Sequence, residues 1–570
     1  MRSGQISSSI RHLGTVHSQS DCEATITTQP VPDRTSLVPH YAFAETLAEQ
    51  EAQLRVNPLM QRLIAARQGY SNDPHRPIYH YVNPENTLND PNGLCLWQGR
   101  WHLFYQAYPP EDPRQHWGHA VSDDLIHWRD LPYAIYPNPE ECCFSGATLV
   151  EAGRVIAIYH GTKVGNMVAL SHDPLLLNWE KLTGQAVIPS TNSDGSPLPY
   201  PVFDPCIWQK EGVYYSLSGG TVPHPPSGKR RAADFLLRSH DLVKWEYLHP
   251  FVESDVFTLT GDDGACPYFW PIGDRHLLLF FSHMSGGQAL LGDYDQDRDK
   301  FFVTAHHRFN FGAFPPGGIH APSATPDGKG GIIAIFNMNR AKPTLGWDQI
   351  MTLPRRLTLL GADRFGRDAL SIEPAGAIES LRREHRIVGQ ITLPANQEIV
   401  LEQIEGNAIE IVAEIDTNDA PLVEVNVLRS PGREEYTRIA FYLQRGYRNW
   451  ERYAGWERGQ LAAATDSLIT IDSSYSSNLS DVRSRAPETA PVYLAPGELL
   501  KLRIFVDKSV VEVFVNGKQC VAVRVYPGRG DSTGVSLRAQ GKAALLRCLD
   551  VWQMQNIYAA SSSSSMSGDD

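Results

Sequence analysis

The sequence predicts an all-β protein: a five-bladed β-propeller, followed by a C-terminal β-sandwich and preceded by an N-terminal helical extension. Two observations predict this fold class. The chain of 570 residues contains 45 glycines and 40 prolines and is 10% aromatic, a composition that favours short strands and turns. A hairpin and a turn motif each recur between residues 75 and 372, as the blades of a propeller do.

The first 40 residues are polar and rich in Ser and Thr, so we expect residues 1–40 to be disordered. They lack the apolar segment of a secretory signal, and the eight cysteines form no C-x-x-C pair. Both features predict reduced thiols and a cytoplasmic protein. Residues 41–74 place leucines at helical spacing among Ala, Glu and Gln, which predicts a helical brace packed on the main domain.

The propeller is predicted over residues 75–372 from two repeated elements. Three hairpins begin alike, with a proline that leads into an aromatic-rich strand, at Asp90-Pro91, Asp204-Pro205 and Cys266-Pro267. A turn motif containing Ser and Asp leads to a tryptophan in each of three places, at Trp128, Trp179 and Trp245. A unit of roughly 50–60 residues with about four short strands is typical of a propeller blade, and the range holds about five of these units.

The C-terminal part has strands without the blade motif. Residues 373–386 are predicted to form a linker with a short helix. Residues 502–517 alternate apolar and polar positions as a hairpin, and an Asn-Gly turn follows the second strand. The pattern predicts a β-sandwich over residues 387–558, followed by a Ser-rich disordered tail at 559–570.

Charge and hydropathy exclude two classes of partner. The net charge of −13 is spread without a basic stripe, which argues against nucleic acid. A run of about 18 apolar residues is absent, which argues against a membrane-spanning helix. The edges of the sandwich leave a homo-oligomer open.

Asp90 is the first candidate for a catalytic group. Pro91 fixes its own φ and favours an extended Asp90, and Asn92-Gly93 supplies a tight turn, so the carboxylate lies where a strand begins. Asp204 occupies the equivalent position of a later repeat. Because the inner strands of a propeller converge on one axis, we expect the two carboxylates to face each other in a central funnel. Two structural turn residues are the alternative.

Facing carboxylates in a funnel suggest glycoside cleavage. A retaining glycosidase needs an ionised nucleophile and a protonated acid/base about 5–5.5 Å apart. Aromatic rings supply flat faces for a sugar, and Trp117, Phe144 and Trp347 are the candidates. Each of the three is equally compatible with a place in the propeller core.

The stretch at residues 89–93, Asn-Asp-Pro-Asn-Gly, resembles the signature of glycoside hydrolase family 32, which comprises invertases, fructan hydrolases and fructosyltransferases. Further segments similar to the family extend over most of the chain: residues 104–106, 116–122, 144–146, 347–355 and 505–512. The resemblance implies that Asp90 is the nucleophile, attacking the anomeric carbon of a β-fructofuranosyl unit, and that Asp204 stabilises the transition state. It implies a fructose subsite and neither a metal nor an organic cofactor. The implied subsite residues are Asn89, Gln106, Trp117, Phe144 and Ser145.

Two departures from the family pattern alter the expected site. Phe203 replaces the Arg of the family's Arg-Asp-Pro, and Ala265 replaces the Glu of its Glu-Cys-Pro. Alanine cannot transfer a proton. The nearest carboxylates, Asp262 and Asp263, lie between two glycines that let the loop bulge. We hypothesise that one of them is the acid/base and favour Asp263 for its proximity, with a structural turn pair as the alternative.

The leading interpretation is a retaining β-fructofuranosidase that cleaves sucrose or short fructans through a covalent fructosyl-Asp intermediate. A fructosyltransferase shares that intermediate and stays open as an alternative. A sugar-binding protein on a degenerate hydrolase scaffold is the alternative from another class, supported by the missing Arg and Glu. Retention of both Asp90 and Asp204 favours an enzyme, because a binding protein needs no nucleophile. A five-bladed hydrolase of arabinosides is a weaker alternative.

Overall fold

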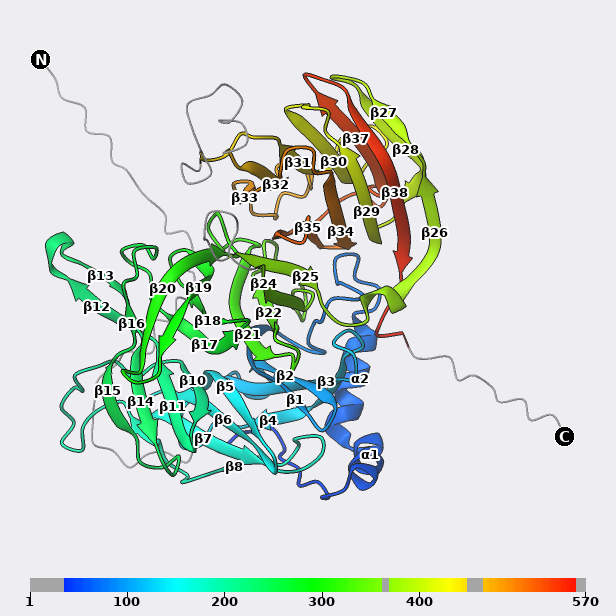
Figure 1. Cartoon of the computed structure of the whole chain (residues 1–570). Helices are drawn as coiled ribbons and strands as arrows, with labels where there is room; N and C mark the ends of the chain where they lie inside the picture. The colour runs from blue at the N-terminus through cyan, green and yellow to red at the C-terminus, as the bar shows by residue number, and fades with distance from the viewer. Residues whose placement is uncertain (1–34, 361–368, 449–464, 560–570) are drawn as a thin grey trace, which may run out of the picture.

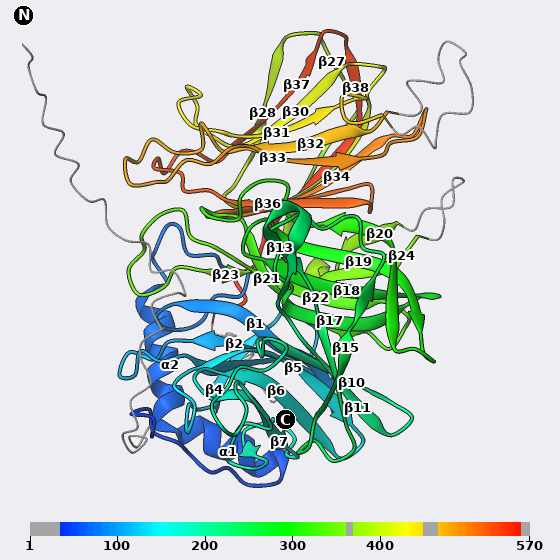
Figure 2. The same ribbon diagram turned by 90° about the vertical axis from the view of Figure 1, so that its left-hand side faces the viewer.

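The computed structural model describes residues 35–360, 369–448 and 465–559. In the described part, a β-propeller and a β-sandwich lie one above the other, and two helices flank the propeller (Figure 1). Figure 2 shows the sandwich as a separate layer on one side of the propeller. This architecture confirms the predicted all-β fold class. None of the described helices is long and apolar enough to cross a membrane.

The described propeller residues form five sheets of four or five strands and one separate two-stranded hairpin. The first contains β1 (Leu88–Trp97), β2 (Arg100–Ala107), β3 (His116–Ser122) and β4 (Arg129–Ile135), and the second contains β5 (Cys143–Glu151), β6 (Arg154–Gly161), β7 (Gly165–Ser171), β8 (Glu180–Lys181) and β9 (Ile188–Pro189). The third contains β10 (Pro205–Lys210), β11 (Val213–Ser218), β14 (Phe235–Ser239) and β15 (Glu246–Pro250). The fourth contains β16 (Val252–Glu253), β17 (Ala265–Ile272), β18 (Arg275–Ser282), β19 (Gly286–Asp295) and β20 (Lys300–Arg308), and the fifth contains β21 (Ile319–Pro326), β22 (Ile332–Met338), β23 (Ile350–Met351), β24 (Arg355–Leu359) and β25 (Leu370–Pro374).

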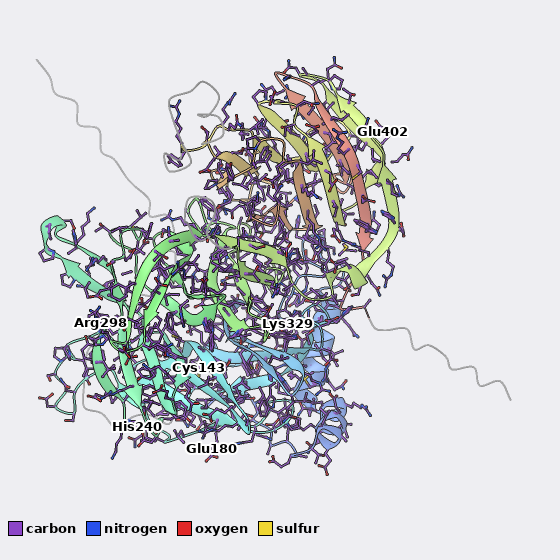
Figure 3. The ribbon with its side chains drawn as sticks, in the orientation of Figure 1. Cys143, Glu180, His240, Arg298, Lys329 and Glu402 are labelled. Carbon is purple, nitrogen blue, oxygen red and sulfur yellow. The ribbon has the colours of Figure 1, made fainter. Side chains whose placement is uncertain are left out.

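The strands β1, β5, β10, β17 and β21 contact one another in a closed ring. They are mostly buried along their length, as expected for strands that line the axis of a propeller. A small hairpin of β12 (Thr221–His224) and β13 (Lys229–Ala232), joined by a 3-10 turn, η2 (Pro225–Ser227), projects from the third sheet (Figure 1). Figure 3 shows Cys143 inside the propeller, Arg298 at the outer edge of the propeller and Glu402 on the sandwich.

Two helices cover the first sheet, α1 (Leu47–Val56) and α2 (Pro58–Gly69). The Asn57 side chain accepts a hydrogen bond from the amide of Met60, and Pro58 begins α2 with a φ suited to a helix. Residues 35–40, which were expected to be disordered, partly pack on the propeller, because Ser36 Oγ lies 2.6 Å from His116 Nε2. Residues 1–34 and 560–570, which hold most of the predicted disordered ends, lie outside the described residues.

The sandwich consists of two described sheets whose apolar faces meet in one core. One sheet contains β26 (Arg382–Val388), β27 (Ile391–Leu393), β29 (Ala408–Asp416), β34 (Leu500–Asp507), β35 (Val510–Val515), β36 (Gln519–Arg524) and β38 (Ala544–Met554). The other contains β28 (Glu398–Glu405), β30 (Leu422–Arg429), β31 (Thr437–Tyr442), β32 (Ser467–Asp472), β33 (Glu488–Val492) and β37 (Gly534–Gln540). β26 begins at Arg382, inside the range 373–386 expected to be a linker, because it pairs with β38; a 3-10 turn, η3 (Ile378–Leu381), precedes it.

A buried ionic clasp joins the two domains. Asp507, at the end of β34, accepts hydrogen bonds from the amides of Ile78, Tyr79 and His80 at 2.8–2.9 Å and lies 2.9 Å from His80 Nδ1. Glu512 on β35 lies 3.1 Å from His80 Nε2. Burial opposes a charge on His80, but the hydrogen bonds that its ring donates to the two carboxylates outweigh burial and raise the pKa of the imidazole.

Two further contacts complete the clasp. Arg355 Nη2 lies 2.8 Å from the second oxygen of Glu512, and both side chains are fully buried. The Tyr558 hydroxyl donates to the carbonyl of His80 and accepts from the amide of Val82, at 2.9 and 3.0 Å. The end of the described chain therefore contacts the segment that leads into β1.

Candidate active site

The candidate residues meet where the inner strands begin. Asp90 is the third residue of β1, and Asp204 immediately precedes β10. The other site residues also lie near the beginning of inner strands: Ser145 in β5, Cys266 in β17 and His320 in β21. The pairing of β1, β5, β17 and β21 with their neighbours is irregular at these same positions. A β-bulge re-aims side chains at the end of a strand, and here the four irregularities coincide with the residues around Asp90.

Asp90 is buried and held from several sides. Its Oδ2 accepts hydrogen bonds from Ser145 Oγ at 2.6 Å and Gln106 Nε2 at 3.2 Å, and Cys266 Sγ lies 3.7 Å away. Its Oδ1 lies 3.0 Å from His320 Nδ1. Burial opposes ionisation, but the charge of His320 and the hydrogen bonds from His320 and Ser145 outweigh it and lower the pKa of Asp90. Asp90 is therefore ionised at neutral pH, as a nucleophile must be.

Asp204 shares the Cys266 thiol with Asp90. Its Oδ2 accepts hydrogen bonds from the Cys266 amide at 3.2 Å and from Sγ at 3.4 Å. Burial, followed by the charge of Asp90, raises the pKa of Asp204 to about 7. The site thus contains two neighbouring carboxyl groups whose surroundings shift their pKa values in opposite directions, which is typical of groups with different catalytic roles.

Three of the predicted sugar-binding residues surround Asp90. Asn89 Nδ2 donates to Gln106 Oε1 at 3.0 Å, and Gln106 Nε2 donates to Ser145 Oγ at 2.8 Å. Asn89 Oδ1 accepts from Asn337 Nδ2 at 3.2 Å. The structure brings these amide and hydroxyl groups together beside the carboxylate, where they could bind sugar hydroxyls.

An apolar wall lies beside the carboxylates. Phe203 and Phe314 pack, half-buried, against a small cluster that includes Ala265 and Phe281. Phe144 is half-buried, and its ring centroid lies 6.1 Å from that of His160, which in turn is 5.4 Å from the ring of Phe203. The two departures from the family pattern, Phe203 and Ala265, are therefore part of one apolar surface.

Trp117 and Trp347, which were predicted to bind sugar, are core residues in this structure. Trp117 is fully buried, and its Nε1 donates to the carbonyl of Phe144 at 2.9 Å. Trp347 is 2% exposed, and its Nε1 donates to Asp73 at 2.8 Å. Neither indole offers a face to a ligand: Trp117 packs on Phe104 and Tyr159. The guanidinium groups of Arg76 and Arg524 lie over the ring of Trp347.

Asp262 and Asp263 have different surroundings. Asp262 is fully buried and accepts hydrogen bonds from Ser282 Oγ at 2.7 Å, Ser285 Oγ at 2.6 Å and the amide of Leu259 at 2.6 Å. These contacts are those of a structural turn residue, the alternative left open above. Asp263 is partly exposed, but His283 contacts both of its oxygens, through its amide at 2.8 Å and through Nδ1 at 2.6 Å.

His283 is the site residue that sequence reasoning missed. Burial disfavours its charged form, but the hydrogen bond and charge of Asp263, together with the charges of Asp204 and Asp90, outweigh burial and raise the pKa of the imidazole. The sequence carried a signal for it. His283 follows the strand that pairs with β17, so a register assignment for this hairpin would have placed it near Ala265.

A separate cavity of about 340 Å³ lies at the other end of the ring, where the inner strands finish. Its lining includes Trp208, Trp270 and Tyr294 and contains neither Asp nor Glu. The carboxylate pair and the amide network therefore mark the end where the strands begin as the candidate active site.

Two protein-family models match the chain. Residues 80–374 match the glycosyl hydrolases family 32 N-terminal domain, and residues 377–553 match the family 32 C-terminal domain. A levanase of Bacillus subtilis (strain 168) is 26% identical over 535 residues, covering 87% of this chain and 72% of the relative. A sucrose-6-phosphate hydrolase of Escherichia coli is 26% identical over 521 residues, covering 84% and 94%.

A solved structure supports the same fold. Fructan 1-exohydrolase IIa from Cichorium intybus superposes with a TM-score of 0.71 at 22% identity, over 85% of this chain and 98% of that one. The first family model alone spans more than half of the 570 residues. This chain therefore belongs to glycosyl hydrolase family 32.

Proposed function

We propose that this protein hydrolyses terminal β-D-fructofuranosyl linkages of sucrose or short fructans, with retention, through a covalent fructosyl intermediate on Asp90. Family membership makes it a β-fructofuranosidase-type glycosidase. Titles of two similar solved structures name complexes with 1-kestose and with sucrose, which supports a carbohydrate substrate. The observation that carries the proposal is the carboxyl pair, Asp90 with a lowered pKa and Asp204 with a raised one.

In this mechanism Asp90 attacks the anomeric carbon while Asp204 faces the positive charge that develops on the sugar ring. The charge of Asp90 raises the pKa of Asp204 in the free site. As Asp90 becomes an ester, that charge disappears and Asp204 ionises more readily, so its negative charge is available when the sugar is most positive. Asn89 and Gln106 are placed to bind fructose hydroxyls and to keep Asp90 oriented.

Product analysis tests the proposal. Wild type and Asp90→Asn would be incubated with sucrose, inulin and levan, and the products separated by chromatography. We expect fructose from the wild type and none from Asp90→Asn, with the β-anomer appearing first by NMR. Asp124→Asn, at a surface turn, is the matched control and should retain full activity.

Three other outcomes would change the proposal. New oligosaccharides in place of fructose would indicate a fructosyltransferase, in which a sugar intercepts the intermediate instead of water. Measurable sugar binding without any product would indicate a sugar-binding protein. The replacement of the family's Arg and Glu by Phe203 and Ala265 favours that alternative. Loss of retention, seen as α-fructose first, would contradict the covalent intermediate.

A further inference from the structure

Retaining hydrolysis needs a group that protonates the departing oxygen and later removes a proton from water. Asp90 is ionised and cannot donate, and Ala265 carries no acid. Asp204 is 4% exposed and is held by Cys266, so it is shielded from the solvent with which a general acid/base exchanges protons. The acid/base must come from another residue at the mouth of the site.

The hairpin of β17 and β18 places two candidate side chains beside Ala265. Ala265 pairs with Phe281 in this antiparallel hairpin. Asp263 lies two residues before β17, and His283 directly follows β18, so the two residues flank the same end of this hairpin. They contact each other there, with Nδ1 2.6 Å from Oδ2 and the His283 amide 2.8 Å from Oδ1.

His283 is more exposed to solvent than the two carboxylates. Its side chain is 39% exposed, whereas Asp90 and Asp204 are each 4% exposed. Its ring centroid is 6.4 Å from that of His320, whose Nδ1 lies 3.0 Å from Asp90. Among the described residues, the charges of Asp263, Asp204 and Asp90 favour the protonated imidazole and raise its pKa.

We propose that His283, oriented by Asp263, is the general acid and base of this site and replaces the carboxyl group missing at Ala265. This inference rests on the proposed function. Because Asp263 binds Nδ1, Nε2 is the nitrogen that carries the transferred proton. Asp263 acts as a positioning residue that fixes the ring and stabilises the imidazolium, as a carboxylate does for histidine in many hydrolases.

The proton balance closes over two steps. In the first, an oxygen of Asp90 bonds to the anomeric carbon, the bond to the departing oxygen breaks, and that oxygen takes the Nε2 proton and leaves as an alcohol. In the second, neutral His283 takes a proton from water, the water oxygen bonds to the anomeric carbon, and the ester bond to Asp90 breaks. Both Asp90 and the imidazolium are then restored.

Other nearby groups fit this role less well. Asp262 is enclosed by three hydrogen bonds, and His320 contacts the nucleophile itself. Asp234 is 4% exposed, and its carboxyl group lies against Gly264. His283 combines proximity to the carboxylates with access to solvent.

The test compares His283→Gln on two substrates. Sucrose has a leaving group that needs a proton, whereas the nitrophenolate of 4-nitrophenyl β-D-fructofuranoside needs none. We expect kcat/KM for sucrose to fall about 10²–10⁴-fold. The burst of nitrophenol from a single turnover should fall less than tenfold, and azide should speed steady-state turnover of the variant by attacking the intermediate without a base.

The pH profile gives a second readout. Wild-type kcat/KM should fall as pH rises through the raised pKa of His283, because the acid is then deprotonated, and this alkaline limb should disappear in His283→Gln. Asp263→Asn should shift the limb to lower pH, since it removes the first charge that stabilises the imidazolium. The double variant Ala265→Glu, His283→Gln should have a kcat/KM for sucrose at least tenfold higher than that of His283→Gln alone.

A matched control exists in the chain. Asp124 holds His127 through the same two contacts, amide to Oδ1 at 2.8 Å and Nδ1 to Oδ2 at 2.7 Å, on an exposed turn. His127→Gln should keep activity within twofold of the wild type. Sucrose hydrolysis by His283→Gln within threefold of the wild type would overturn the inference, as would equal losses on both substrates with unchanged thermal stability. A wild type that cleaves no fructoside would overturn the proposed function itself, and this inference with it.

Discussion

Replacement of Glu512 by Gln tests the buried clasp between the propeller and the sandwich. Glu512 is fully buried and accepts from His80 Nε2, the amide of Leu353 and Arg355 Nη2 at 3.1, 2.7 and 2.8 Å. The change keeps the volume of the side chain but removes its charge. Arg355 and the protonated His80 then share one neutral amide inside the protein.

The expected loss of unfolding free energy follows from the positive charges that Glu512→Gln leaves without a carboxylate partner. Removing one partner of a buried ion pair costs about 3–5 kcal/mol, because the remaining charge stays desolvated. Two cations face Glu512, so we expect the upper half of that range. The exposed pair of Arg129 and Glu51 is the control, and Glu51→Gln should cost less than about 1 kcal/mol.

The assay is urea unfolding followed by tryptophan fluorescence at several pH values. The folded-state pKa of His80 is raised, so its contribution is fully present below the unfolded pKa of about 6.5 and is lost as pH rises through the folded value. The difference between wild type and Glu512→Gln should therefore be largest near pH 6 and shrink at alkaline pH. A cost below about 1 kcal/mol at pH 6, equal to that of the surface control, would refute this account of the clasp.

Three further predictions concern the propeller. Trp117→Ala should lower the unfolding free energy by about 3–5 kcal/mol while KM for sucrose changes less than threefold, because the ring is fully buried; a KM effect without a stability effect would contradict this. Ser145→Ala removes a 2.6 Å hydrogen bond to Asp90 that helps to lower its pKa, so the acidic limb of the rate profile should move to higher pH; an unmoved limb would contradict this. Asp234 is buried, and its pKa is raised to about 7 in the folded state. The unfolded state has a pKa of about 3.9, so between these two pH values the folded state binds an extra proton. The free energy of unfolding therefore falls as pH rises from about 3.9 to about 7. Asp234→Asn should therefore be more stable than the wild type at pH 8 in thermal melts, and a less stable variant would contradict the assignment.

The fold class could be predicted because it depends on local patterns. Strand periodicity, turn residues and repeats can be recognised directly in the sequence. The equivalent positions of Asp90 and Asp204 in the repeat predicted that both carboxylates lie near the propeller axis. The role of the residues near 507 and 512 as an interdomain clasp could not be predicted, since it depends on a contact with residues more than 400 positions away.

Side-chain roles were harder to predict than backbone elements. Trp117 and Trp347 have the right chemistry to stack on a sugar, but their burial depends on contacts with residues far away in the sequence, such as Arg524 for Trp347. Periodicity does not define those contacts. The contact of Asp263 with His283 could be predicted only with the register of one hairpin, because the two residues flank the paired Ala265 and Phe281. When a site is assembled from neighbouring strands, the strand register decides which side chains meet, and composition alone does not give the register.

The clasp also bears on the order in which the molecule is completed during synthesis. The amides of residues 78–80 receive their carboxylate from Asp507, and Tyr558 adds the last contacts. These amides therefore cannot bind their carboxylate partner until residue 507 has left the ribosome. The segment that leads into β1 therefore gains these contacts only after the sandwich strands β34 and β35 have been made.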